Sequence, residues 1–199
     1  MRARGFSLLE LMIVLTIIAT LAALAIPNLI RAKMAANEVA SIAMIKSFGT
    51  SQELYHRTDW DGNGFLEYAQ NIGPNGGNGN LESLYFNIKS NSITGLMDSS
   101  VINAEVPKSG SYTTVTPRNG YMFYVQLGTA FPIVTSYVNS KGAMTQGYSI
   151  CGLPNQYSLS GVNSFQMNSN GVIFAKDQGA NTLVPAYNVN PVNAWVVTQ

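Results

Sequence analysis

The densest group of potential metal ligands lies in the stretch DWDGNGFLE. Its oxygen donors alternate along the chain: Asp59, Asp61, Asn63, the backbone carbonyl of Phe65, and Glu67. Alternating oxygen donors around a tight Gly turn match the opening of an EF-hand-type calcium loop. Gln70 stands at position twelve, where such a loop normally has a bidentate Glu. Two interpretations therefore stay open: a calcium site, or a turn rich in Asp and Gly that needs no ion.

The other reactive side chains form no recognisable catalytic motif. His56 is the only histidine, so a zinc triad or a nucleophile–base pair built on it has little support, and we expect it at the surface near a helix end. Ser149 lacks the second Gly of a nucleophile elbow, and the Gly-rich stretch 73–79 lacks the Lys-Ser/Thr of a phosphate-binding loop. Cys151 is the only cysteine, so no intramolecular disulfide forms, and whether it is buried or links subunits stays open. The sequence predicts no enzyme and no required cofactor, with calcium as the one candidate ligand.

A single carboxylate interrupts an apolar segment near the start of the chain. From Phe6 to Ile26 every residue is apolar or small except Glu10. A carboxylate in an apolar environment is tolerated only when it is protonated or paired. Cleavage after Gly5 would create an α-ammonium group on Phe6, about one helical turn from Glu10, and the two charges could pair within one helix or between staggered copies.

The apolar segment is the first part of a longer predicted helix. Its 21 residues match the ~20 that a helix needs to cross a bilayer core. A cleaved signal peptide is the competing interpretation, but helical periodicity continues beyond Pro27. The residues that recur three or four apart are Val39, Ile42, Ile45, Phe48, Gln52 and Tyr55. A helix over residues 6–55 would need lipid or neighbouring copies around its first half, and Pro27 predicts a kink or a melted turn near residues 23–27.

The short basic leader, the sequence Gly5-Phe6-Ser7-Leu8-Leu9-Glu10, the apolar helix and Pro27 together resemble the class III signal of type IV prepilins and of type II secretion pseudopilins. The resemblance implies cleavage between Gly5 and Phe6 by a prepilin peptidase and methylation of the Phe6 amine. It also implies that an inner-membrane platform assembles the protein with identical or related pilin subunits, and that Glu10 neutralises the Phe6 amine of an adjacent subunit. The precursor would lie in the inner membrane and the product in a periplasmic or cell-surface filament.

Downstream of the helix the periodicity becomes strand-like. Strands are predicted at 84–89, 111–116, 121–127 and 131–138, and a hairpin joins 164–168 to 172–176 through Ser-Asn-Gly. An antiparallel sheet packed on the helix gives an α+β, pilin-like fold. The predicted organisation is a leader at 1–5, an apolar helix at 6–27, its amphipathic continuation at 28–56, and a β head at 57–199.

Charge and cysteine content limit the function classes. From Glu38 onward the chain carries seven Lys/Arg against nine Asp/Glu, a net charge of −2, so we expect no nucleic-acid partner. A single cysteine excludes the cysteine-stapled carboxyl-terminal loop of many type IV pilins. The leading hypothesis is a subunit of a type IV pilus-like surface filament. A type II secretion pseudopilin and a membrane-anchored calcium-binding or adhesive module that never polymerises are the alternatives.

Overall fold

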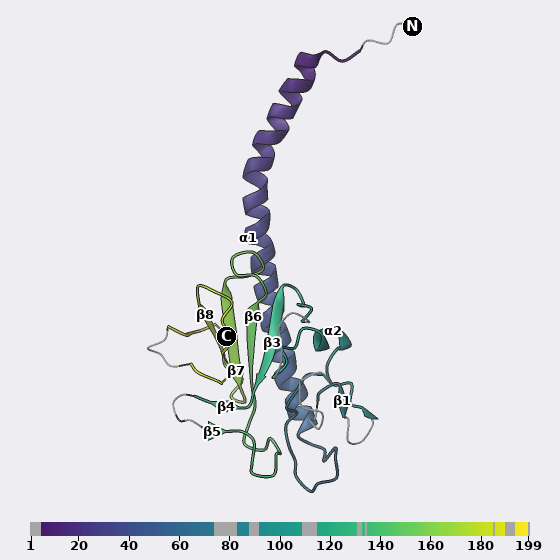
Figure 1. Ribbon diagram of the computed structural model, residues 1–199, viewed down its shortest axis with the longest axis vertical. Helices are drawn as coiled ribbons and strands as arrows, with labels where there is room; N and C mark the ends of the chain where they lie inside the picture. Colours follow the sequence, from purple (N-terminus) through teal and green to yellow (C-terminus); the bar gives the residue numbers. More distant parts are fainter. Residues whose placement is uncertain are drawn as a thin grey trace.

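The computed structural model describes residues 5–73, 83–87, 92–108, 115–130, 133, 135–184, 186–189 and 194–198. Its architecture is α+β, as the sequence predicts, with one long helix and an antiparallel sheet. Figure 1 shows the amino-terminal half of the helix projecting beyond the head while the other half lies alongside the sheet. Of the predicted leader, only Gly5 is among the described residues.

The long helix α1 (Leu8–Tyr55) has 48 residues, about 72 Å at ~1.5 Å per residue. It begins after Ser7, whose side chain caps it, and remains helical through Pro27. The melted turn predicted at 23–27 is therefore absent, and Figure 1 shows only a gentle curve. Proline fits this geometry because its fixed φ is helical, and the cost is limited to one backbone N–H and the crowding of the preceding turn.

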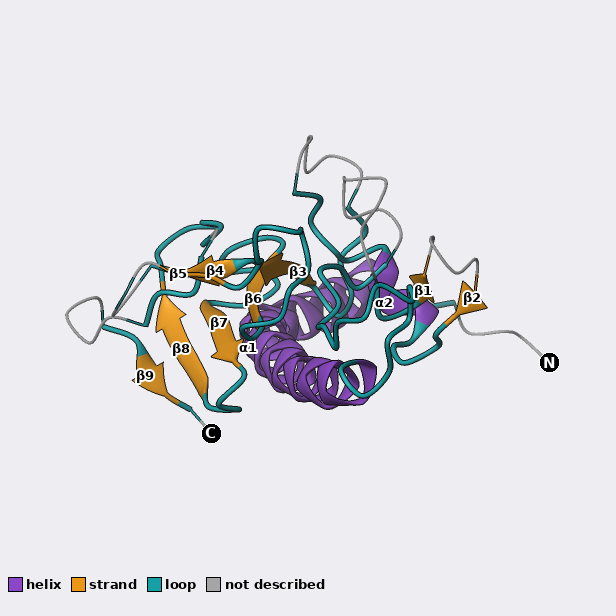
Figure 2. Ribbon diagram, turned by 90° about the horizontal axis from the view of Figure 1, so that it is seen from below, coloured by secondary structure: helices purple, strands orange, loops and turns teal. Residues whose placement is uncertain are grey.

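The main sheet has five antiparallel strands in the order β3-β6-β7-β8-β9. Their bounds are β3 (Tyr121–Gln126), β6 (Ser149–Pro154), β7 (Asn163–Asn168), β8 (Ile173–Asp177) and β9 (Val196–Val197). Figure 2 shows this sheet on one side of α1 and the small elements β1, β2 and α2 on the other. The helix therefore lies between the sheet and a layer of short segments.

The β7–β8 hairpin confirms the clearest local prediction from the sequence. Its register pairs Phe165 with Ala175 and Met167 with Ile173. The turn contains Gly171 at φ +76°, a conformation that residues with a Cβ rarely adopt. The Ser-Asn-Gly connection thus lets the chain reverse without strain.

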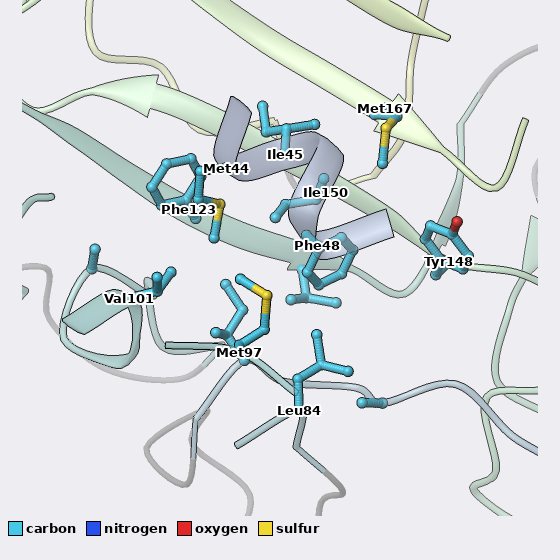
Figure 3. Close-up of a cluster of buried hydrophobic side chains, with 14 of the residues drawn as sticks. Met44, Ile45, Phe48, Leu84, Met97, Val101, Phe123, Tyr148, Ile150 and Met167 are labelled. Atoms are coloured by element: carbon cyan, nitrogen blue, oxygen red, sulfur yellow. The ribbon is translucent and has the colours of Figure 1, made fainter. Parts of the chain in front are cut away.

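The core lies between α1 and the sheet. Ile45 and Phe48 are fully buried on the helix and face Phe123 and Ile150 on β3 and β6, as Figure 3 shows. Ile45, Phe48, Gln52 and Tyr55 of the predicted apolar face are buried, whereas Val39 is exposed. The apolar stripe of the helix therefore contacts the head only from about Ser41 onward.

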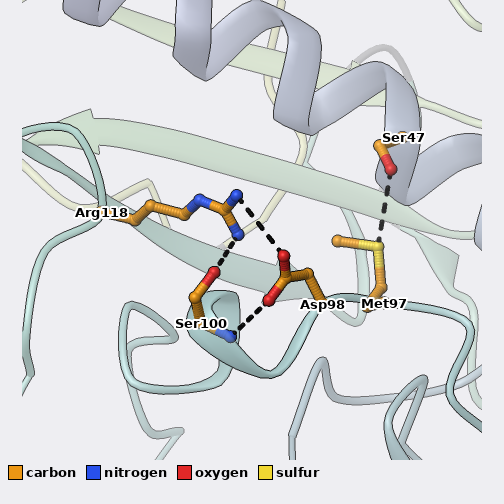
Figure 4. Close-up of polar contacts among 5 residues, drawn as sticks. All are labelled: Ser47, Met97, Asp98, Ser100 and Arg118. Carbon is orange, nitrogen blue, oxygen red and sulfur yellow. Dashed lines mark hydrogen bonds and ion pairs between the residues drawn. The ribbon is translucent and has the colours of Figure 1, made fainter.

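Short elements complete the head. They are the hairpin of β1 (Phe86–Asn87) with β2 (Ser92–Ile93), the helix α2 (Ser99–Ile102), and the hairpin of β4 (Gly128–Thr129) with β5 (Thr135–Ser136). Figure 4 shows how α2 is held: Asp98 caps it, and Arg118 lies 3.8 Å from the Asp98 carboxylate. Met97 contacts Ser47 of α1 through its sulfur at 3.9 Å.

Some predicted strands differ from those observed. The described parts of 84–89 and 131–138 contain two-residue strands only, and most of 111–116 lies outside the described residues. The interior strand β6, which pairs with β3 and β7, was not predicted. Every residue of β6 is buried, so its sequence SICGLP lacks the alternation of polar and apolar residues that marks a half-buried strand.

Candidate assembly site

The amino-terminal end of α1 carries the predicted processing and assembly residues. Gly5, Phe6 and Ser7 precede the helix, and the Phe6 side chain is 83% exposed. Ser7 has extended backbone angles, with φ −81° and ψ 149°. The Gly5–Phe6 bond therefore lies in an open, non-helical segment, which is the form a peptidase would need to bind.

Glu10 has a local partner that sequence reasoning missed. The Ser7 backbone N–H donates to Glu10 Oε2 at 2.9 Å, and the Glu10 N–H donates to Ser7 Oγ at 3.2 Å. This reciprocal pair is a capping box, which satisfies backbone donors that the first helical turn leaves free. A Ser followed three residues later by Glu before an apolar run is its sequence signature. Glu10 thus holds a capping position in the single chain, and its predicted pairing with a Phe6 amine would be an additional role.

The first half of α1 is apolar on all sides and uncovered. Every large apolar side chain from Leu8 to Ile30 is exposed. Thr16 and Thr20 donate their hydroxyl groups to the carbonyls of Met12 and Ile17, both at 2.8 Å, so their polar groups are satisfied within the helix. Among the described residues, α1 is the one helix long and apolar enough to cross a membrane. This segment suits lipid or a bundle of like helices.

The second half of α1 is fixed to the head by polar contacts. The Glu38 carboxylate accepts from the Val162 and Asn163 N–H groups at 2.9 and 3.1 Å, and from Asn163 Nδ2 at 3.1 Å. The Asn37 amide donates to the Ser160 carbonyl at 2.7 Å. These contacts lie where the helix enters the head. They join residues more than 120 positions apart, so no local sequence signal identified them.

A second polar contact lies near the end of the helix. The fully buried Gln52 side chain donates to the Ala69 carbonyl at 2.7 Å and accepts from the Ala69 N–H at 2.9 Å. The amide thereby pairs with the chain in the manner of a neighbouring strand. It fixes the segment after α1 against the helix, so the exposed half of α1 extends from a rigid base.

The predicted calcium ligands form a compact loop satisfied by its own hydrogen bonds. The Asn63 N–H donates to Asp59 Oδ1 at 3.2 Å and to Asp61 Oδ1 at 3.1 Å, and Asn63 Nδ2 donates to Glu67 at 3.0 Å. The Phe65 N–H donates back to Asn63 Oδ1 at 2.8 Å. The loop thus gathers its carboxylates around an amide. In the described part of the chain, no three His, Cys, Asp or Glu side chains are placed to hold a metal ion.

Gln70, which stands at position twelve of the candidate calcium loop, contacts a different part of the chain. Its amide donates to the Gly142 carbonyl at 2.6 Å. Calcium binding through Asp59, Asp61, Asn63, Phe65 and Glu67 stays a prediction, and it would require Asn63 to exchange its carboxylate contacts for the ion.

The remaining reactive residues occupy structural positions. His56 is the C-cap of α1 and is half-buried, stacked on Tyr68 with ring centroids 4.2 Å apart, so it is less exposed than expected. Ser149 lies in the buried strand β6. Cys151 is a free thiol, and of the two positions that the sequence left open it has the buried one.

Comparisons with known proteins agree with this geometry. The prokaryotic N-terminal methylation motif matches residues 1–26, and the family described as "Protein of unknown function (DUF2950)" matches residues 24–197. The chain is also similar to a Thermus thermophilus protein, the "Type IV wide pilus major component PilA4", with 47% identity over 53 residues. That alignment covers 27% of this chain and 40% of the relative. No solved structure matches. The chain therefore belongs to the DUF2950 family, and its methylation motif and pilin homology place it in the type IV pilin-like superfamily.

Proposed function

We propose that this protein is a structural subunit of a type IV pilus-like surface filament. One observation carries the proposal: the first half of α1 is apolar and exposed on all sides, while the second half is fixed in a folded head. Such a helix is stable only when lipid or other helices cover it. The methylation motif at 1–26 and the pilin relative support a bundle of neighbouring helices as the final environment of this segment.

The route we propose begins with a precursor anchored in the inner membrane by α1. A prepilin peptidase cuts between Gly5 and Phe6, and the new Phe6 amine is methylated. An inner-membrane platform then transfers the subunit from lipid into a filament of identical or related pilins. Each apolar segment exchanges lipid for neighbouring helices, so the transfer leaves no apolar surface in water.

Within the filament, Glu10 neutralises the Phe6 amine of an adjacent subunit and thereby sets the axial stagger. An unpaired charge in an apolar core costs several kcal/mol, so only those axial positions of neighbouring helices that bring the two charges together are favourable. Pro27 would ease bending of the helix during transfer, because the helix lacks one hydrogen bond there. The role is assembly, and the pilin relationship likewise points to a structural protein without enzymatic activity.

A type II secretion pseudopilin is the alternative within the same superfamily. It would share the signal, the cut and the helix, and would differ in forming a short periplasmic fibre. A membrane-anchored module that never polymerises would instead keep its amino terminus uncut.

The test is the mass of the amino-terminal peptide in two fractions, sheared surface material and membranes. A peptide that begins at methylated Phe6 in sheared material is the expected result. The same peptide confined to membranes would favour the pseudopilin. An intact Met1 start in both fractions would overturn the filament proposal.

A further inference from the structure

Lys108 and Asn71 meet in the interior of the head, 37 residues apart in sequence. The Lys108 Nζ lies 2.5 Å from Asn71 Oδ1 and also donates to the Gln70 carbonyl. Asn71 is only 2% exposed. Because a C=O bond is about 1.2 Å long, the Asn71 side-chain carbonyl carbon lies within about 3.7 Å of Nζ. This approaches the separation at which bound reactants are poised to react.

Glu105 is a buried carboxylate at the same place. It is 6% exposed, and its oxygens accept from the Ile72 N–H at 3.0 Å and the Gly73 N–H at 2.8 Å. Those residues directly follow Asn71. The proposed filament uses neither the buried Glu105 nor the half-buried Lys108.

Burial favours the uncharged forms of both groups. It raises the pKa of Glu105 to about 7 and lowers the pKa of Lys108 to about 8, although each is partly opposed by the charge of the other. The lowered pKa of Lys108 increases the share of its neutral amine, which is the nucleophilic form, and this amine lies beside the Asn71 amide.

We propose that Lys108 and Asn71 form an intramolecular isopeptide bond. The Nζ lone pair attacks the Asn71 side-chain carbonyl carbon, and the Nζ–C bond forms. Glu105 carries the proton that Nζ loses to Asn71 Nδ2, the C–Nδ2 bond breaks, and ammonia leaves. One amide replaces another, so nothing is oxidised or reduced and no co-reactant is needed. The burial of Asn71 and Glu105 limits the access of water to the amide and so protects the intermediate from hydrolysis.

The bond would fasten two parts of the head that hydrogen bonds already bring together. Asn71 lies in the segment after α1, which Gln52 holds to the helix through Ala69. Lys108 follows a segment beside β3, where the Val106 N–H donates to the Phe123 carbonyl at 2.7 Å. A covalent link between helix base and sheet resists pulling forces and is independent of redox conditions. Because the chain has one cysteine and cannot form an intramolecular disulfide, the isopeptide bond would provide the covalent cross-link instead.

The experiment is tryptic peptide mapping of the full chain purified from membranes or filaments. Trypsin cuts after Arg57, Lys89 and Arg118, but not after an acylated Lys108. The expected product is peptide 58–89 joined to peptide 90–118, at the sum of their masses less about 17 Da for ammonia. Free peptide 58–89 together with a peptide ending at Lys108, and no joined species, would overturn the proposal and leave a hydrogen-bonded contact only.

Two variants separate the chemistry from folding. Lys108→Arg keeps the cation and its donors but cannot form the amide, so the joined peptide should vanish while circular dichroism stays native. Its unfolding midpoint should fall by roughly 10 °C, the size expected for losing a cross-link across 37 residues. Glu105→Gln keeps the shape of the side chain, and its joined fraction should fall severalfold. An unchanged joined fraction in a folded Glu105→Gln protein would refute the proton-carrying role. All these results are independent of whether the protein forms filaments.

Discussion

At the scale of single residues, Cys151 provides a direct test of the burial of strand β6. The thiol is completely buried in β6, and burial raises its pKa to about 12. Only the thiolate reacts with alkylating reagents. We therefore expect the folded protein to resist iodoacetamide at pH 8 and to react rapidly in urea. Between pH 9 and pH 12 the unfolded thiol ionises first, so stability should fall as pH rises through that range. Rapid labelling of the folded chain would contradict the burial of β6.

The second prediction at this scale concerns the loop at residues 59–67, which contains the candidate calcium ligands. Its carboxylates already accept hydrogen bonds from the Asn63 amide and from nearby backbone N–H groups. The loop should therefore fold without an ion, and we expect EGTA to leave the thermal midpoint unchanged within a degree or two. A midpoint that falls in EGTA, recovers with calcium and becomes insensitive in Asp61→Asn would instead establish a structural calcium site.

At the scale of elements, the junction of α1 with the sheet depends on Glu38. Glu38→Gln removes the charge from three hydrogen bonds made by Val162 and Asn163. Charge-assisted bonds of this kind contribute about 1.5–3 kcal/mol, so we expect a loss of about 2 kcal/mol in the free energy of unfolding, measured by urea denaturation. Val39→Ala is the matched control, because its side chain is exposed on the next residue of the helix, and it should change stability by less than about 0.5 kcal/mol. Equal effects of the two changes would show that Glu38 is not the fastening point.

The β7–β8 turn makes a separate prediction about backbone conformation. A Cβ at Gly171 would meet no heavy atom within 4 Å, so any cost of substitution there comes from its φ of +76°. Asn tolerates this region and β-branched residues do not. Gly171→Asn should destabilise the head by under about 1 kcal/mol, and Gly171→Val by about 2 kcal/mol. Denaturant midpoints that coincide for the two variants would contradict the positive φ.

The accuracy of the sequence predictions follows from how local each signal is. The β7–β8 hairpin was predictable because its signals are local: both strands contain β-forming residues, and the Ser-Asn-Gly turn lies between them. The buried strand β6 has no alternation, and its identity depends on strands β3 and β7 that cover its edges. Glu38 and Lys108 find their partners across 124 and 37 positions, distances over which one sequence carries no pairing signal. Helix α1 was predictable because its apolar residues and its motif lie in one continuous segment of the sequence.

At the scale of the whole molecule, the chain combines a packed head with a helical segment whose apolar side chains are uncovered. The head buries its aromatic and aliphatic side chains between α1 and the sheet. The projecting half of α1 buries none of its large apolar residues up to Ile30. We therefore expect the stability of the head and the proposed assembly to respond to different mutations. Changes at Glu38 or Gly171 test the head, whereas changes at the tip of α1 test assembly.

Glu10 lies at that tip and has two candidate roles, which matched substitutions distinguish. As a cap it needs only an acceptor for the Ser7 N–H, and Gln serves a capping box nearly as well as Glu. As a partner for the Phe6 amine, Glu10 needs a negative charge, which Gln lacks.

We expect both Glu10→Gln and Glu10→Ala to insert in membranes and be cleaved normally, yet to form filaments roughly tenfold or more less often than the unchanged protein, because an unpaired buried charge is costly. Ser7→Ala removes the hydroxyl acceptor of the cap while keeping the charge, and it should assemble nearly normally. The measurement is pilin in the sheared fraction relative to pilin in membranes. Normal assembly of Glu10→Gln with failure of Ser7→Ala would reverse the assignment, since capping of α1 and not charge pairing would then limit assembly.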